Sequence, residues 1–295
     1  MTGDGLAQFL QFLFSGLTVG AAYALAALGF TLIYNASQVI NFAQGEFIML
    51  GGMLTVFFLG LGLPMPVTIL LAILIPAGVG ILIEKFAIEP VKNADVTSLI
   101  IITIGAALVV RGVVQVFLGK GTHSFPAFSG DEPIVIAGAT LLPQSLWVLG
   151  VAAAVVVALG WFFNRTLLGK AILATSFNRL AAQLVGINTS RVLFISYALS
   201  GALGAVGGVL LTPMTMTSYD VGIMLGLKGF VAAVVGGLGS GLGAVVGGLL
   251  VGIIEAMAAG YISSAYKDAV PFVLIFVILV FLPRGLFGGK VTERV

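Results

Sequence analysis

The chain of 295 residues is 60% hydrophobic and 8% charged, and its net charge is +2. Soluble domains carry roughly 25% charged residues, so this composition excludes a soluble globular protein and indicates an integral membrane protein. The absence of cysteine and the single histidine exclude disulfides and thiolate sites and leave too few histidines for a metal cluster. We therefore expect no metal site, and no basic run indicates a nucleic-acid partner.

Apolar runs of about 17 to 25 residues recur along the chain, the length that a helix needs to cross roughly 30 Å of hydrocarbon. They lack the alternation of apolar and polar residues that a transmembrane β-barrel needs. The sequence therefore predicts an all-α membrane protein with about eight or nine transmembrane segments in a single domain, residues 1–295. The candidate spans are residues 9–34, 44–62, 66–84, 97–118, 145–163, 192–212, 227–240, 243–261 and 269–283.

Positive charges in short loops set the expected orientation, because they gather on the cytoplasmic side of a membrane. Lys85 and Lys92 follow the third span, Arg165 and Lys170 follow the fifth, and Arg284 lies in the tail. If the spans alternate in direction, all of these residues share one side. We therefore expect the C-terminus in the cytoplasm and the N-terminus outside.

The sequence NASQVINFAQGEF, residues 35–47, places polar side chains beside apolar runs. Polar groups at membrane depth are tolerated where they are buried in protein or line water. One hypothesis is a broken helix that faces a solute path, with Gly45 breaking the helix; the alternative is a solvated cytoplasmic turn. On the first hypothesis, the candidates for the path are Tyr23, Asn41, Gln44, Gly45 and Glu46.

Charges inside the spans are a separate matter, because a charge near the bilayer centre costs at least about 2.5 kcal/mol. Glu255 is predicted to be a structural polar clamp, with a solute or proton site as the alternative. Arg111 and Lys228 fall near predicted span ends. We expect them to extend toward the headgroups.

The polar, basic segment of residues 164–191 separates the fifth and sixth spans. Residues 170–185 have the pattern of one short amphipathic helix that is too polar to span. Gly186 is placed to end this helix, and residues 188–190 can cap the next one. Such a helix can dock a partner protein; the alternative is a basic helix lying on anionic headgroups.

Glycines of the segment 236–252 repeat at four-residue spacing, which predicts close helix packing. Around them, residues 227–261 form either two short helices or a re-entrant hairpin. Segments that start at Ser200 and Gly229 also resemble segments that start at Ser15 and Gly45. An odd number of spans separates the copies, as in the inverted repeats of transporters, and coincidence between glycine-rich stretches is the alternative.

Four blocks of sequence carry a resemblance to a known family. AAQLVGINTSRV, residues 181–192, resembles the cytoplasmic EAA-type loop of ABC importer permeases, with Leu180 where the general motif has glutamate. The LivH-type subfamily, the permeases of branched-chain amino acid importers, is similarly relaxed there. Its other blocks are matched by VINFAQGEFIMLGG (39–52), SSAYKDAVPF (263–272) and LPRGLFG (282–288), the last with a small departure at its start.

The resemblance implies the permease subunit of an ATP-driven importer in a bacterial-type inner membrane, and no enzyme. It implies a second related permease, two ATP-binding-cassette ATPase subunits and a periplasmic or extracellular solute-binding protein as partners. ATP and Mg would bind to the ATPase subunits, and no cofactor is expected in this chain, which has no GxxxxGK[ST] loop. The residues implied in coupling to the ATPase are Lys170, Arg179, Ala181, Ala182 and Gly186.

The solute that the resemblance implies is a branched-chain or related amino acid. Urea or other amides and aromatic acids are alternatives within the same family of permeases. An ion-coupled secondary transporter is the alternative outside it.

Overall fold

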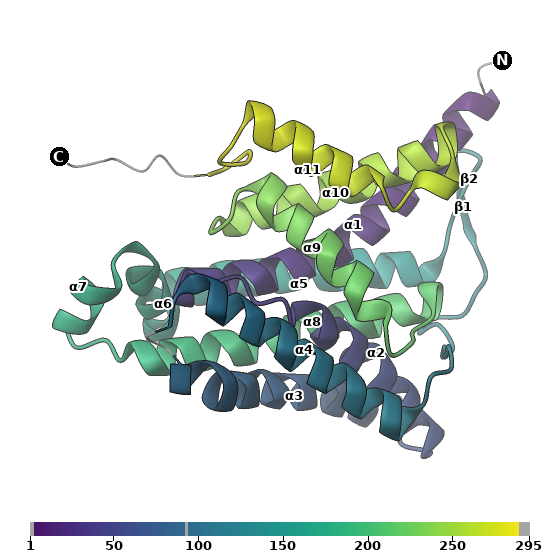
Figure 1. Ribbon diagram of the computed structural model, residues 1–295. Coiled ribbons are helices and arrows are strands. Elements are labelled where there is room, and N and C mark those ends of the chain that lie inside the picture. The colour runs from purple at the N-terminus through teal and green to yellow at the C-terminus, as the bar shows by residue number, and fades with distance from the viewer. Residues whose placement is uncertain (1–2, 92–93, 289–295) are drawn as a thin grey trace.

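The computed structural model describes residues 3–91 and 94–288. It is a bundle of helices with one small β-hairpin at the end where the N-terminus lies (Figure 1). This architecture confirms the all-α membrane fold. The elements are α1 (Gly3–Ser37), α2 (Gln44–Gly60), α3 (Met65–Ile83), η1 (Glu84–Ile88), η2 (Glu89–Val91), α4 (Val96–Leu118), β1 (Ile134–Ile136), β2 (Ala139–Leu141), α5 (Pro143–Arg165), α6 (Leu167–Phe177), α7 (Arg179–Leu184), α8 (Thr189–Thr215), α9 (Val221–Gly236), α10 (Gly241–Tyr261), η3 (Ser264–Tyr266) and α11 (Val270–Phe281).

Every predicted span falls on a helix, and in the described residues 6 helices are long and apolar enough to cross a membrane. Helices α2, α9 and α11 are apolar but shorter. One error that matters for the charged residues concerns α9, which begins at Val221 rather than near residue 227. Lys228 therefore lies in the middle of this helix and not at its end.

Helix α1 is the centre of the bundle. Its second half is buried on all sides, with Leu25, Ala27 and Ile33 completely enclosed. Helices α8, α9 and α10 pack around it, and α8 also packs on α2 and α3. Helices α3, α4 and α5 lie further out, and most of their apolar side chains are at least partly exposed. A helix that is apolar all round and buried belongs in the interior, whereas the outer helices suit contact with lipid.

The glycines of α10 bring this helix into backbone contact with α1. A Cβ added at Gly252 would meet the backbone of Gly20, and one added at Gly248 would meet the backbone of Ala24. The sharp turn between α9 and α10 uses Gly237 and Gly239, whose φ angles are 105° and 92°. The predicted packing role of these glycines is confirmed, and residues 227–261 lie in two helices, α9 and α10, joined by a turn.

The two ends of the bundle differ in what they carry. Helices α6 and α7 and the end of the described chain lie at one end, and the N-terminus and the hairpin β1–β2 lie at the other (Figure 1). Helix α1 runs toward the first end and α8 runs away from it, as an inverted repeat requires. The repeat itself stays a prediction.

Replacing Gly252 by Val should destabilise the protein by about 3 kcal/mol, because the new methyl groups would separate the α1 and α10 backbones. Thermal unfolding of the detergent-solubilised protein would measure this change. Gly105→Val on α4 is the matched control, because a Cβ at that position meets nothing within 4 Å. Equal unfolding temperatures for the two variants would contradict the packing role.

Candidate functional site

The chain is broken between α1 and α2. Gln38, directly after the end of α1, has a φ of 60°, and α2 begins only at Gln44. Asn41 between them is 0% exposed, and its Oδ1 accepts a hydrogen bond from the Ala43 amide at 3.1 Å. The expectation of a solvated turn is therefore wrong for Asn41, and the chain is non-helical between Ser37 and Gln44. The break does not lie at Gly45, as expected, but at Gln38, whose φ is positive, and at the non-helical residues that follow it.

Gln44 and Gly45 hold α2 against its neighbours. Gln44 Nε2 donates to the carbonyl of Ser200 on α8 at 3.2 Å, and the Ser200 hydroxyl also bonds to the Gln44 side chain. A Cβ at Gly45 would meet the carbonyl of Gly222 on α9. These residues therefore fix the start of α2.

Glu46, one residue further along α2, forms an ion pair with Arg111 of α4. Glu46 is 1% exposed, and the Arg111 side chain is 20% exposed. Arg111 lies seven residues before the end of α4, about 10 Å along the helix. The expectation that Arg111 reaches the headgroups is wrong, because a carboxylate on the adjacent helix provides a partner inside the bundle.

A pocket of about 180 Å³ opens beside this ion pair, between α1, α2, α4 and α9. Its charged residues are Glu46 and Arg111, and the rest of its wall is apolar apart from two glycines. The residues that line it are Phe30, Phe42, Glu46, Ile104, Ala107, Leu108, Arg111, Gly222, Ile223, Gly226 and Leu227. Of the five residues expected on a solute path, Glu46 alone contributes to its lining.

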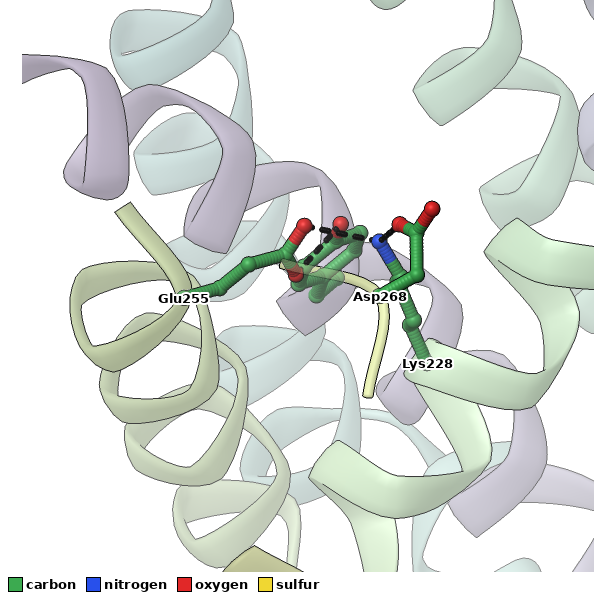
Figure 2. Close-up of polar contacts among 4 residues, drawn as sticks. Lys228, Glu255 and Asp268 are labelled. Carbon is green, nitrogen blue, oxygen red and sulfur yellow. Dashed lines mark hydrogen bonds and ion pairs between the residues drawn. The ribbon is translucent and has the colours of Figure 1, made fainter. Parts of the chain in front are cut away.

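Tyr23 belongs to a second charged group, which joins α1, α9, α10 and the loop before α11. Its hydroxyl donates to Glu255 Oε2 at 3.0 Å. Lys228 Nζ donates to Glu255 Oε1 at 2.7 Å and to Asp268 Oδ1 at 2.6 Å (Figure 2). Tyr23 therefore lies with Glu255 rather than with Asn41 and Glu46, which sequence spacing alone did not indicate.

The position of Lys228 also differs from expectation. Its side chain is 6% exposed and bridges two carboxylates instead of extending to the headgroups. Glu255 receives both a cation and a hydroxyl hydrogen bond, an arrangement that suits the predicted clamp. Asp268 lies in the loop outside the spans, where the Lys228 hydrogen bond holds the pKa of the carboxyl below its ordinary value.

The segment between α5 and α8 contains two helices rather than the one expected. Asn178 separates α6 from α7, because its backbone is extended and its Oδ1 accepts from the Ala181 amide at 3.0 Å, capping α7. The amphipathic pattern predicts one continuous helix here, but the extended backbone and capping hydrogen bond of Asn178 end one helix and start the next. Gly186 ends α7 with a φ of 89°, as expected, and Asn188 caps α8.

Helix α7 projects from the end of the bundle (Figure 1). Lys170, Arg179 and Ala181 are exposed, whereas Ala182 is 3% exposed and packs inward. Leu184 is 88% exposed, and Phe177, Leu180 and Val185 are also largely exposed. Apolar side chains gathered in this way mark a surface that contacts either a partner protein or the membrane.

Comparison with known proteins identifies relatives over nearly the whole chain. The sequence model of the family described as "Branched-chain amino acid transport system / permease component" matches residues 12–279. The chain is 33% identical to the high-affinity branched-chain amino acid transport system permease protein LivH of Salmonella typhimurium, over 97% of this chain and 98% of that protein.

Two further relatives extend the comparison. The high-affinity branched-chain amino acid transport system permease protein BraD of Pseudomonas aeruginosa is 32% identical, over 98% of each chain. The probable branched-chain amino acid transport permease protein LivH of Methanocaldococcus jannaschii is 28% identical, over 90% of this chain and 88% of that protein. The residues that the family model matches include the break after α1, both charged groups and the α6–α7 segment.

Lys228→Met should destabilise the protein by about 3 kcal/mol, because Glu255 would lose the cation that compensates its burial. Thermal unfolding in detergent measures the effect. The double variant Lys228→Met, Glu255→Gln removes the uncompensated charge and should recover most of the loss. A double variant as unstable as the sum of the two single variants would contradict this account.

Asp268→Asn should lower the unfolding temperature at pH 7 and have a diminishing effect as the solution is acidified. The reason is that a carboxyl with a lowered pKa contributes stability above the ordinary aspartate range, about 4, and loses it as the pH falls through the lowered value. Unfolding curves between pH 7 and pH 3 test this. Asp131→Asn in an exposed loop is the control, and a pH-independent effect of Asp268→Asn would refute the prediction.

Proposed function

The chain belongs to the family of branched-chain amino acid transport system permease components, and we propose that it is the membrane-spanning permease subunit of an ATP-driven importer for branched-chain or related amino acids. The family is one of transport components, so the chain is not an enzyme. The observation that supports the amino acid substrate is the 33% identity over 97% of this chain to a branched-chain amino acid permease.

The importer would contain this chain, a second related permease, two ATP-binding-cassette ATPase subunits and an external solute-binding protein. The exposed apolar side chains of α7 support the ATPase contact. Helix α7 projects from one end of the bundle (Figure 1), close in sequence to the loop cations Arg165 and Lys170. That end would be cytoplasmic, with the N-terminus outside in an inner-membrane protein. ATP and Mg would bind to the ATPase subunits, which leaves this chain without a cofactor.

Motion of the ATPase subunits would reach the membrane through α6 and α7. Helix α6 is fastened to the end of α5, because Gly169 packs against the Phe162 carbonyl and its amide donates to the Thr166 cap at 3.0 Å. Helix α8 begins a few residues after α7 and packs against α2 and α3. A displacement of α7 would thus be transmitted to α5 and α8 and would tilt the helices around the break in the chain.

The solute path would run beside the start of α2. Glu46 supports this placement, since it is buried and lines a pocket. Asn41, Gln44 and Gly45 would shape the path by fixing the backbone that presents Glu46. Tyr23 lies apart from this pocket with Glu255, so it would hold α1 to α10 rather than contact the solute.

Uptake into proteoliposomes tests the proposed function. The chain, its partner permease and the ATPase subunits would be reconstituted together, with ATP inside and the binding protein and labelled leucine outside. We expect leucine uptake that requires both ATP and the binding protein. Uptake of urea or an aromatic acid instead of leucine would support the alternative solutes. Uptake by this chain alone under an ion gradient would indicate a secondary transporter.

Leu184→Asp should abolish copurification of the ATPase subunits, because it places a charge on the most exposed apolar position of α7. Pull-down from detergent-solubilised membranes measures the loss, which we expect to exceed tenfold. Leu61→Asp is the control, since Leu61 is also exposed but follows α2 at the opposite end of the bundle. An unchanged complex with Leu184→Asp would favour the alternative that the segment only lies on lipid headgroups.

A further inference from the structure

The pocket beside Glu46 and Arg111 combines opposite charges with apolar walls. We propose that it is a transient binding site for a zwitterionic amino acid, in which Arg111 binds the carboxylate, Glu46 binds the ammonium group and the apolar wall receives the side chain. This inference rests on the proposed function, because it assigns the part of the permease that contacts the transported solute. It also adds Arg111 to the solute path, a residue that the sequence suggested only as a structural cation.

Unsatisfied polar atoms point to a ligand. Among the residues that the structure describes, Glu46 Oε2 and Arg111 Nε are buried and have no hydrogen-bond partner. Buried polar atoms without partners are rare because each costs about 1–3 kcal/mol. A zwitterion would satisfy both, since its ammonium group donates to a carboxylate and its carboxylate matches the planar fork of a guanidinium.

The exposed side of the pocket supports the same conclusion. Ile104 of α4 and Ile223 of α9 are exposed at its rim, and the Arg111 side chain is partly exposed between these helices. If this side of the bundle faced lipid, a partly exposed charge would lie against hydrocarbon, which is costly. The face between α4 and α9 therefore lines a path or meets protein, and in a transporter of two permeases it would face the second permease.

The dimensions and chemistry of the pocket restrict the solute. A volume of about 180 Å³ is roughly six times the 30 Å³ that one water occupies in the liquid, enough for a small solute. The walls contributed by Phe30, Leu108 and Leu227 are apolar and can bury an aliphatic side chain. A neutral amide such as urea carries no charges for the ion pair to recognise, so the pocket favours the amino acid over this alternative.

Binding at this site would be weak. The solute must separate Glu46 from Arg111 before each can form its own ion pair with one end of the zwitterion. One ion pair is thus exchanged for two while the total charge in the pocket stays zero. Part of the binding free energy is lost in breaking the original pair, which allows the solute to leave again.

Uptake by charge-neutralised variants separates a binding role from a structural one. In the reconstituted importer, Glu46→Gln and Arg111→Gln should each lower leucine uptake more than tenfold. The double variant Glu46→Gln, Arg111→Gln should assemble with the ATPase subunits and hydrolyse ATP like the wild type, yet remain more than tenfold impaired in uptake. If the pair only stabilises the bundle, the double variant would recover uptake, and the proposal would be overturned.

The ion pair of Lys228 and Glu255 provides a matched control, because neither residue lines the pocket. The double variant Lys228→Met, Glu255→Gln should retain leucine uptake within about twofold of the wild type. A tenfold loss in this control as well would show that neutralising any buried pair blocks transport, and the assignment of the Glu46–Arg111 pocket would fail.

Protection of an introduced thiol tests occupancy directly. The chain has no cysteine, so Leu227→Cys in the pocket and Ile69→Cys in a separate apolar pocket can be labelled with a maleimide in an importer whose partners lack reactive thiols. Millimolar leucine should slow labelling of the Leu227→Cys variant more than fivefold and leave the Ile69→Cys variant unaffected. 4-Methylvalerate and isoamylamine, which each lack one charged group, should not protect.

The outcomes distinguish the two proposals. If the wild-type importer takes up leucine but leucine does not protect the Leu227→Cys variant, the binding site is wrong and the proposed function stands. If the wild type takes up no leucine, the proposed function fails. Equal protection by leucine and by both analogues would also reject the site, because the ion pair would then have no part in recognition.

Discussion

The close contact between α1 and α10 determines how the rest of the bundle is arranged. Because Gly20 and Gly252 have no side chains, the two backbones run antiparallel in direct contact, and two long side chains on either side of this contact can reach each other. These are the side chains of Tyr23 and Glu255, whose hydrogen bond is 3.0 Å long. Lys228 then joins α9 to the same carboxylate. The glycines therefore create both the packing and the place where a charge can be compensated.

The same physical rule applies to the Lys228 group and to the Glu46–Arg111 pair, although their surroundings differ. A charge inside a membrane protein is stable only with a partner, so each ion pair fixes one helix to another. The Lys228 group is enclosed by α1, α9 and α10 and continues to Asp268, which is half exposed at the end of the bundle. The Glu46–Arg111 pair is bordered by a pocket instead. Enclosure suits a structural connection, whereas an adjacent cavity leaves room for another molecule.

Much of the fold could be predicted because hydropathy depends on the sequence alone. The apolar runs, the end of α7 at Gly186 and the packing of the α10 glycines all follow from local residue chemistry. The pairing of Arg111 with Glu46 could not be predicted, because it depends on which helices are neighbours. When the neighbouring helices are unknown, the arrangement of lowest free energy for a lone arginine is one in which its side chain extends to the headgroups. Asn178 is a residue type that commonly caps helices, but the amphipathic pattern that continues past it predicted a single unbroken helix.

Helix α7 is six residues long, fewer than two turns, and helices of this length are not stable alone in water. Its shape depends on the Asn178 cap, the Gly186 turn and the buried Ala182 side chain, all on the side that faces its own chain. The opposite side, with Leu180 and Leu184, is unsupported within the described chain. A short helix of this kind can transmit motion only when protein contacts hold it on both sides. In the proposed importer, a displacement would therefore pass from α7 to the membrane helices only when a partner subunit also holds this side of α7.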